Sequence, residues 1–375
     1  MKPVRIEGDI LTPDGFVRGT LCVKAGRVDG ITGTPLAAAA VRAAERPIVL
    51  PGFIDLHVHG GGGRDIMEGG DAAGRVAGLH ARHGTTALLA TTMTAPLAEI
   101  RSALRALAPA IDQRAAGGAR VLGVHLEGPY INPGKLGAQP NFARAASVSE
   151  IEELCAIAPI RVVTLAPELI DSPEAIHRLH AAGIRVQIGH TLGTYEDGVA
   201  ALEAGASGFT HLFNAMTAMH HREPGMVGAA LAHAQYSEII PDLLHAHPGA
   251  IRAALRAIPC LYCVTDSTAA SGMPDGDYRL GRHRVTKCLG GVRLPDGTLA
   301  GSTLTMDQAL RNLTGIGLAL DDASRRVSTH AADYLGLAER GRLAPGAWAD
   351  VVVLDRDLNL QRVFVEGGEI ELTDA

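Results

Sequence analysis

The sequence of 375 residues lacks the features that mark several classes of protein. It has no apolar run of about 18 residues or more, the length that a membrane-spanning helix needs. Its 34 Lys and Arg residues are outnumbered by 40 Asp and Glu residues, so the net charge is −6 and there is no overall basic field for nucleic acid. We therefore expect neither a membrane nor a nucleic-acid partner, and an anionic ligand would need a local cluster of donors.

Cysteine is scarce as well. The five cysteines are an odd number and lie far apart in a long chain, which argues against a disulfide framework and for a reducing compartment. The first residues, MKPVRIEGDILTPDG, lack the apolar core of a signal peptide. Both features predict a cytoplasmic protein. Cys260 and Cys263 form a lone CxxC within an apolar run, so we interpret them as packing residues rather than as a zinc or redox site.

From residue 51 onward, short apolar runs alternate with amphipathic stretches of about 10–15 residues, which is typical of a parallel sheet. The expected strands are 53–59, 85–91, 119–127, 161–167, 184–190, 206–211, 238–244 and 260–265. Helices are expected at 98–111, 172–183 and 194–205. Eight such strands favour closure into an α/β fold of the (β/α)8 TIM-like barrel type over an open sheet.

The two ends of the chain have a different texture. Residues 1–50 contain short β-like pieces separated by Gly and Pro, and residues 341–375 return to the same pattern. We expect these two segments to pair into a small β-sandwich domain built from both chain termini. The barrel would then occupy residues 51–340.

Histidines and one glutamate lie where the expected strands end. His57 and His59 are two residues apart on a strand, so their side chains point to the same face and can converge on one ion. Glu127 ends the strand VLGVHLE, and His190 and His211 follow two later strands. Carboxyl ends of barrel strands carry the active sites of this architecture, and imidazole with carboxylate is a ligand set suited to Zn²⁺ or a similar divalent ion.

Asp266 ends a further strand and could exchange a proton with a metal-activated water, although Asp-Ser is also an ordinary helix N-cap. His125 shares the face of Glu127 and could ligate instead of it, but we interpret it as a pore-lining residue deeper in the barrel. The loop HHREPG carries His220, His221 and Arg222, and an Arg fork is suited to phosphate. In an acidic protein this local cluster favours anion recognition over a merely solvated turn.

Taken together, these motifs resemble the N-acetylglucosamine-6-phosphate deacetylase family of the amidohydrolase superfamily. The resemblance covers residues 50–375 and rests on PGFIDLHVHGGGG, HLEGPYINPGKLGA, IGHT, THLFNAM with HHREPG, VTDSTAASGMPDGDYRLG, LAGSTLTMDQAL and the closing PGAWADVVVLD. HxH and PGxxD alone indicate only the superfamily, whereas HLEGP with LFNAM and VTD is specific for the deacetylases.

The resemblance implies hydrolysis of N-acetylglucosamine 6-phosphate to glucosamine 6-phosphate and acetate in amino-sugar catabolism. Metal-bound hydroxide would attack the amide, with Asp266 as general acid and base and His245 stabilising the oxyanion. Glu127, His190 and His211 would hold the principal ion and His57 with His59 a second one, so that each subunit binds one or two ions, with Zn favoured over Fe or Mn.

The resemblance also implies substrate contacts and a homodimer, or a tetramer built as a dimer of dimers, in which His220 or His221 of a neighbour's loop serves the phosphate site. The substrate-binding residues expected are Ala138, Gln139, the backbone of Asn214 and Ala215, His221, Arg222, His245, Leu299, Ala300, Gly301 and Ser302. Two positions depart from the family. Gln139 stands where His is frequent, and PDLLH at 241–245 stands where a Gly-containing DGxH is commoner, which bears on the turn before His245.

Two alternatives remain at this point. Another amidohydrolase acting on a cyclic amide, such as a dihydroorotase-like enzyme, would share the ligands but would not need the phosphate cluster. A non-catalytic sugar-phosphate sensor would not need Asp266. The selectivity between gluco and galacto epimers does not follow from the sequence.

Overall fold

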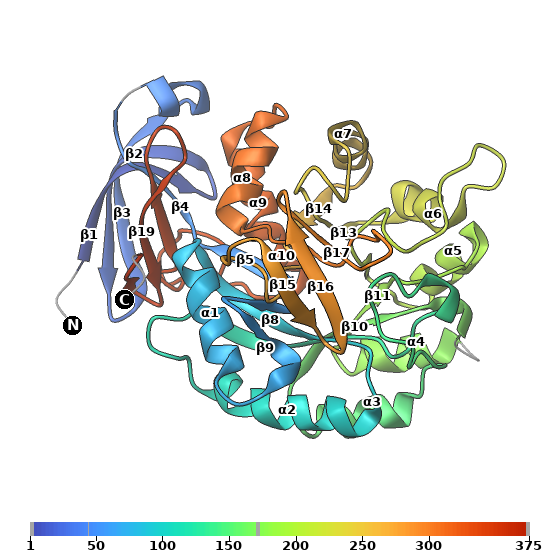
Figure 1. Ribbon diagram of the computed structural model, residues 1–375. Coiled ribbons are helices and arrows are strands. Elements are labelled where there is room, and N and C mark those ends of the chain that lie inside the picture. The colour runs from blue at the N-terminus through green and yellow to red at the C-terminus, as the bar shows by residue number, and fades with distance from the viewer. Residues whose placement is uncertain (1–3, 44, 170–172, 373–375) are drawn as a thin grey trace.

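The computed structural model describes residues 4–43, 45–169 and 173–372. Two units lie side by side (Figure 1): a β-sheet built from segments near both ends of the chain and a larger α/β unit with helices around its strands. Within the described residues, no helix is long and apolar enough to cross a membrane.

Eight strands form the wall of the larger unit. Six are hydrogen-bonded into one parallel sheet in the order β12-β11-β10-β9-β8-β5, and β13 pairs with β14. Two further contacts close the ring: Leu212 N–H donates to Glu238 O at 3.0 Å, and Asp266 N–H donates to His57 O at 2.9 Å. The strands are β5 (Phe53–Val58), β8 (Thr85–Thr92), β9 (Arg120–Glu127), β10 (Ile160–Leu165), β11 (Arg185–Ile188), β12 (Gly208–Phe209), β13 (Tyr236–Ile239) and β14 (Cys260–Cys263). The expected barrel architecture is confirmed.

Helices cover the outside of this wall, and several of them have one apolar face that packs against it. In α2, for example, Ile100, Ala103, Leu104 and Leu107 recur at helical spacing and are buried. The helices are α1 (Ala72–Arg82), α2 (Leu97–Asp112), α3 (Val148–Cys155), α4 (Pro173–Ala181), α5 (Tyr195–Glu203), α6 (Gly225–His233), α7 (Pro248–Ala257), α8 (Met306–Gly315), α9 (Leu320–Arg326) and α10 (Thr329–Tyr334).

The terminal segments form one seven-stranded sheet in the order β20-β19-β18-β4-β1-β2-β3, as expected of a β unit built from both ends (Figure 1). Its own core includes Ile10, Leu21, Val49, Val351 and Phe364. Its strands are β1 (Val4–Thr12), β2 (Gly15–Lys24), β3 (Arg27–Leu36), β4 (Ile48–Pro51), β18 (Val351–Leu354), β19 (Leu360–Val365) and β20 (Gly368–Ile370). The domain boundaries at 50 and 340 stay a prediction.

A small antiparallel sheet lies beside the mouth of the barrel (Figure 1). It contains β15 (Gly276–Leu280), β16 (His283–Cys288) and β17 (Gly291–Arg293). Leu280 and Val285 pack with Met93 from the barrel in a separate hydrophobic cluster. The buried carboxylate of Asp65, which ends the short β7 (Arg64–Asp65) next to β6 (Gly60–Gly61), accepts from Gly281 N–H at 2.7 Å and so holds the turn between β15 and β16 in place.

One expected strand was placed wrongly. The segment 238–244 was expected to be extended, but β13 is Tyr236–Ile239 and the chain turns from Pro241. Asp242 explains the turn, because its Oδ1 accepts from Leu244 N–H at 2.9 Å and His245 N–H at 2.8 Å. The helix expected at 172–183 is α4; its first expected residue lies outside the described part of the chain.

Glu366 ties the terminal sheet to the barrel wall. Its carboxylate, between β19 and β20, accepts two hydrogen bonds from Arg120 at 2.9 Å, one from Arg340 at 2.5 Å and one from Arg114 at 3.3 Å. Burial alone would raise the pKa of Glu366, but the hydrogen bonds from Arg120 and Arg340 outweigh it and hold the pKa at about 2.

Glu366→Gln should therefore lower the free energy of unfolding at pH 7 by about 2–3 kcal/mol, measured by urea titration. The pKa of Glu366 is depressed in the folded state, so its stabilisation is complete above the ordinary value of 4.5 and is lost as the pH falls toward 2. The difference from wild type should shrink by about 1 kcal/mol between pH 7 and pH 4. Glu369→Gln is the control, because its pair with Arg362 is exposed and should contribute less than about 0.5 kcal/mol.

Candidate metal centre and active site

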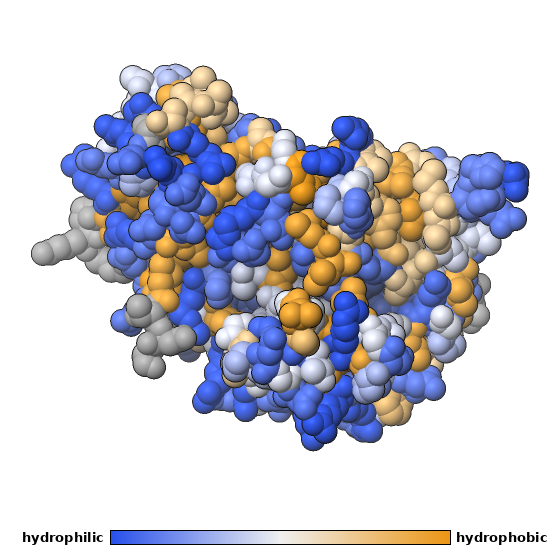
Figure 2. Space-filling model, turned by 45° about the horizontal axis from the view of Figure 1, so that its top comes forward, coloured by the Kyte–Doolittle hydropathy of each residue, from blue (hydrophilic) through white to orange (hydrophobic). Residues whose placement is uncertain are grey.

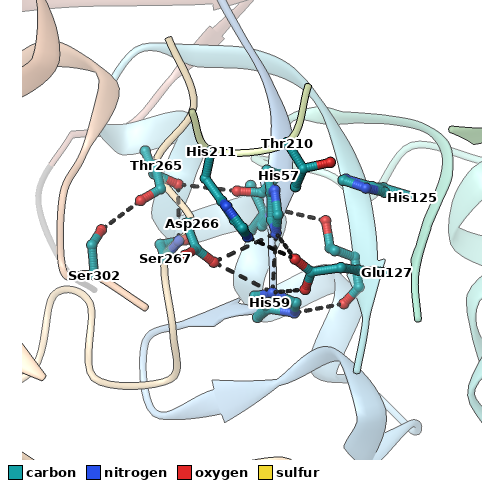
Figure 3. A network of polar contacts seen from close by, with 12 residues as sticks. His57, His59, His125, Glu127, Thr210, His211, Thr265, Asp266, Ser267 and Ser302 are labelled. Carbon is teal, nitrogen blue, oxygen red and sulfur yellow. Dashed lines mark hydrogen bonds and ion pairs between the residues drawn. The ribbon is translucent and has the colours of Figure 1, made fainter. Parts of the chain in front are cut away.

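A cavity of about 450 Å³ opens where the barrel strands end. Its floor is formed by Glu127 at the end of β9, by His59 just after β5, and by His190, His211 and Asp266, which follow β11, β12 and β14. Figure 3 shows the side chains of His57, His59, His211, Glu127 and Asp266 pointing toward one another. The structure thus brings together the residues that were expected at the strand ends.

The two oxygens of Glu127 face different groups. Oε1 lies 3.2 Å from His190 Nε2 and 3.1 Å from His211 Nε2, and these two nitrogens are 3.1 Å apart. Oε2 lies 3.1 Å from His59 Nε2 and accepts a hydrogen bond from Gln139 Nε2 at 2.5 Å. Glu127 is therefore shared by two sets of histidines: Oε1 faces His190 and His211 and also lies 3.5 Å from His57 Nε2, whereas Oε2 faces His59.

His57 and His59 form the second set. Their Nε2 atoms are 3.2 Å apart, and Asp266 Oδ1 lies 3.5 Å from the first and 3.3 Å from the second. His57 is fully buried, whereas His59 lines the cavity. Both sets have the atom spacing of a possible metal centre: Glu127 with His190 and His211, and Glu127 with His57 and His59.

The hydrogen bonds of the rings test whether a cation fits. His190 Nδ1 lies 2.8 Å from Lys135 O, and His59 Nδ1 lies 3.2 Å from Thr91 O. A carbonyl oxygen only accepts, so each Nδ1 carries the hydrogen and each Nε2 of a neutral ring presents a lone pair. Those lone pairs face the oxygens of Glu127, a repulsive arrangement unless a positive charge lies between them. The donor set therefore fits a divalent cation.

The charges of the site point in the same direction. Burial alone would raise the pKa of Glu127, but His57, His190 and His211 outweigh it and hold the pKa well below its ordinary value. Burial likewise opposes ionisation of Asp266, and His57 with His59 lowers its pKa nevertheless. Burial would lower the pKa of His59, but Asp266 and Glu127 raise it to about 9, because a proton on the ring supplies the positive charge between these groups when no metal ion does. Ionised carboxylates thus make this cavity strongly attractive to positive charge.

The backbone is strained where it aims these side chains. His190, His211 and Asp266 each lie in the left-handed region, with φ of 50°, 30° and 51°. Each follows a barrel strand by two or three residues, where the chain turns outward. A non-glycine residue in this region costs about 1–3 kcal/mol, and such strain persists only where the surroundings impose it.

The residues expected to contact substrate fall into three groups. Ala138, Gln139, Asn214, Ala215, His245, Leu299 and Gly301 line the same cavity as the histidines. Ala300 and Ser302 are buried, and Ser302 Oγ donates to Thr265 O at 2.5 Å. His221 and Arg222 lie apart from the cavity on an exposed loop, where Arg222 Nη1 is 2.7 Å from His221 Nε2.

His125 lies to one side of the metal centre (Figure 3), deeper in the barrel, as expected from the sequence. With His57 and Glu238 it has the spacing of a third possible metal group. Both of its ring nitrogens are engaged, however, Nδ1 with Leu56 O at 3.1 Å and Nε2 with Thr164 Oγ1 at 2.7 Å. Burial lowers the pKa of His125 to about 4, so we interpret it as a neutral packing residue.

Two polar residues of this region were missed in the sequence. Glu238 in β13 is fully buried behind His57, and the misplaced strand obscured its position. Lys135 is, among the described residues, the one Lys or Arg that lines the cavity. Lys135 lies in η3 (Pro133–Lys135), directly after HLEGPYIN. Its closeness to Glu127 in the sequence was the only sign that it could line the cavity.

The segment PDLLH keeps its turn without a glycine. Leu243 has φ of 67°, a conformation that favours glycine, and 38% of its surface is exposed. Asp242 Oδ2 lies 2.7 Å from His245 Nδ1 and fixes the ring toward the cavity. The departure from DGxH therefore strains the backbone at Leu243 but leaves the side chain of His245 directed at the cavity.

The chain belongs to the amidohydrolase family, whose model matches residues 48–370. This family is metal-dependent, in agreement with the candidate centre. The chain is 39% identical over 367 residues to N-acetylgalactosamine-6-phosphate deacetylase of Escherichia coli O157:H7, with 96% of each chain covered. It is 38% identical to N-acetylglucosamine-6-phosphate deacetylase of Vibrio furnissii, covering 85% of this chain and 82% of the relative.

Solved structures show the same similarity. An N-acetyl-D-glucosamine-6-phosphate deacetylase mutant from Mycobacterium smegmatis, in complex with N-acetyl-D-glucosamine 6-phosphate, superposes with a TM-score of 0.90 at 34% identity, covering 99% of this chain and 100% of the other. The deacetylase from Thermotoga maritima superposes with a TM-score of 0.89 at 32% identity, covering 98% and 99%.

Leu243→Gly should relieve the strain in the turn before His245. A left-handed Leu costs roughly 1–2 kcal/mol, part of which the entropy of Gly cancels, so we expect a gain of about 0.5–1 kcal/mol in the free energy of unfolding. Leu244→Gly is the matched control, because Leu244 has no left-handed φ and should lose about 1 kcal/mol. Equal destabilisation in urea titrations of both variants would contradict the interpretation.

Proposed function

We propose that the protein removes the N-acetyl group of an N-acetylhexosamine 6-phosphate, with N-acetylglucosamine 6-phosphate as the substrate, and releases acetate. The observation that carries the proposal is the convergence of Glu127, His190, His211 and Asp266 on one cavity in a member of the amidohydrolase family. The relatives and the solved structures named above, all deacetylases of amino-sugar phosphates, support the substrate class.

Glu127, His190 and His211 would hold the principal ion, and His57 with His59 a second one. Zn²⁺ is our first choice because its preferred ligands are imidazole and carboxylate, and Fe²⁺ and Mn²⁺ accept the same donors. A divalent ion bound there would supply the Lewis acidity that polarises an amide carbonyl and makes water a better nucleophile.

Asp266 is proposed to move the protons of the reaction. It lines the cavity, and its lowered pKa keeps it ionised and ready to accept a proton from the attacking water. The same carboxyl group can then return the proton to the nitrogen of the leaving amine. Its strained backbone and the hydrogen bond from Ser302 N–H to Asp266 O, at 2.7 Å, hold it in one position.

His245 is proposed to bind the carbonyl oxygen of the acetyl group. Burial alone would lower the pKa of His245, but Asp242 outweighs it and raises the pKa above its ordinary value. This favours the doubly protonated ring. With Nδ1 held by Asp242, the Nε2–H is then available to donate to the negative charge that develops on the oxygen.

The phosphate end is proposed to use donors from two sources. Within one chain, Lys135 lines the cavity, and its Nζ lies 3.3 Å from Met216 O, beside the loop of His211, Asn214 and Ala215. In that loop His211, Phe213 and Ala215 have positive φ, and the residues between them do not. This alternation directs successive backbone N–H groups to one side, where they can bind an anion. Arg222 lies on an exposed loop and would reach the phosphate of a neighbouring copy.

We further propose a homodimer. Figure 2 shows hydrophobic side chains gathered in the middle and on the right of the visible face. Among the described residues, the large hydrophobic side chains that remain exposed are Phe142, Leu192, Met219, Leu243, Leu244 and Leu289. A surface of this kind favours a protein partner. All five cysteines are free, which supports the reducing cytoplasm as the location.

N-acetylgalactosamine 6-phosphate is a second candidate substrate. The relative that acts on it matches 96% of both chains. The two sugars differ only in the orientation of one hydroxyl group, so kcat/KM for acetate release, measured with both at several concentrations, decides between them. Unphosphorylated N-acetylhexosamines and cyclic amides should be turned over far more slowly, and equal turnover would argue against a phosphate site.

Asp266→Asn should reduce kcat for acetate release by at least about 100-fold, because the amide cannot accept the proton of the attacking water. The metal content of the variant, measured by elemental analysis, should stay close to that of wild type. Deacetylation at a near-normal rate would remove Asp266 from its proposed role.

Arg222→Gln should raise KM by about 10- to 100-fold, since a charge-assisted hydrogen bond to phosphate contributes about 1.5–3 kcal/mol. Co-expression of R222Q and D266N chains with different tags allows purification of hybrid dimers. In each hybrid, one pocket combines an intact Asp266 with Arg222 of the neighbour, so activity at low substrate should return to about half of wild type. Hybrids as inactive as the parents would show that Arg222 does not act across a dimer.

A further inference from the structure

Glu238 has no contact with the cavity, yet it meets both histidine sets. It lies in β13, is fully buried and is absent from the residues that line the cavity within the described chain. Its Oε2 lies 3.0 Å from His57 Nδ1 and accepts from the backbone N–H of His211 at 3.2 Å. One oxygen atom thus contacts one residue from each set.

The contact with His57 determines which ring nitrogen faces the centre. An ionised carboxylate only accepts, so His57 Nδ1 carries the hydrogen and Nε2 is left with a lone pair directed at His59, Glu127 and Asp266. Without an acceptor at Nδ1, the hydrogen of a neutral ring can move to Nε2, which cannot then bind a cation.

The contact with His211 has a different purpose. His59 and His190 are oriented by carbonyl oxygens at Nδ1, whereas His211 Nδ1 is buried with no hydrogen-bond partner among the described residues. The orientation of His211 therefore depends on its backbone, which is strained at φ of 30°. Glu238 holds that backbone twice, through its side chain and through Glu238 O, which accepts from Leu212 N–H at 3.0 Å.

We propose that Glu238 is a positioning residue that orients both histidine sets for cation binding, by fixing the tautomer of His57 and the backbone of His211 through a single oxygen. The role rests on the proposed metal-dependent hydrolysis, but it concerns the binding of the ion and is independent of which substrate is used. In this role Glu238 would touch neither substrate nor ion, because it does not line the cavity.

Three variants of Glu238 distinguish the effect of its hydrogen-bond acceptor from the effect of its negative charge. Glu238→Met keeps the volume and removes the acceptor, and Glu238→Asp keeps the charge but withdraws the oxygens by one methylene. Both should weaken the affinity for Zn²⁺, measured by competition with a chelator, by about 10- to 100-fold. Glu238→Gln retains a carbonyl oxygen that can accept both hydrogen bonds, and its affinity should stay within about threefold of wild type.

Tyr262→Phe is the matched control, because Tyr262 OH, which accepts from Gln187 Nε2 at 2.6 Å, donates at 3.5 Å to Glu238 Oε1, the oxygen that contacts neither histidine. Its Zn²⁺ affinity should remain within about twofold of wild type. Replacement of Zn²⁺ by Co²⁺ gives a second readout, the visible absorption spectrum of the bound ion. The wavelengths of its bands should shift in E238M and E238D and stay unchanged in E238Q. Loss of stability alone would leave the bands of the folded fraction unchanged. Circular dichroism identifies the folded variants, and if E238M does not fold, E238D and E238Q decide the question.

Wild-type affinity in E238D or E238M would overturn the proposal, as would an E238Q variant as weak as E238M, because charge rather than hydrogen bonding would then be the cause. Zn²⁺ binding requires no substrate. Failure of wild-type protein to release acetate would refute the proposed function without changing this result, and unaltered Zn²⁺ affinity would refute the role of Glu238 without changing the proposed function.

Discussion

The buried carboxylate of Glu127 is the group on which the arrangement of the barrel mouth depends. A carboxylate that is 1% exposed is costly unless every side of it is compensated, and here two oxygens are served by side chains from four different segments. Strands β5, β9, β11 and β12 must therefore end at matching heights, since a shift of one residue in any of them would turn its polar side chain away. The register of these parallel strands therefore determines which polar side chains meet in the cavity.

The loops that follow these strands must also be held in place. Glu168 shows how they are held: its carboxylate accepts from Asn132 Nδ2 at 2.9 Å, Thr191 Oγ1 at 2.5 Å and Leu192 N–H at 2.7 Å. The loop after β9 and the loop after β11 are thereby joined, and the left-handed backbone of His190 is kept between them. Strain at the site is balanced by hydrogen bonds that lie just outside it, which is the usual condition for strained residues to persist.

Much of the site followed from the sequence because strand geometry is local. The spacing of His57 and His59, and the position of Glu127 at the end of an apolar run, needed only the alternation of side chains along a strand. Glu238 could not be found in this way, because its role depends on which strands are neighbours and its own strand begins two residues earlier than the apolar pattern suggested. The contact between Gln139 and Glu127 was equally hidden, since it joins a strand to a loop whose path the sequence does not define.

The strand order of the terminal sheet determines the order in which its strands can pair during synthesis. β4 pairs with β1 on one side and with β18 on the other, yet some 300 residues separate β4 from β18 in the chain. One edge of β4 therefore stays open while the whole barrel is translated, and an open apolar edge invites pairing with the wrong chain. β18 is made only after the barrel and is the strand that closes this edge, so a chain cut short before β18 would contain all the residues of the candidate metal centre but would keep an unpaired strand edge.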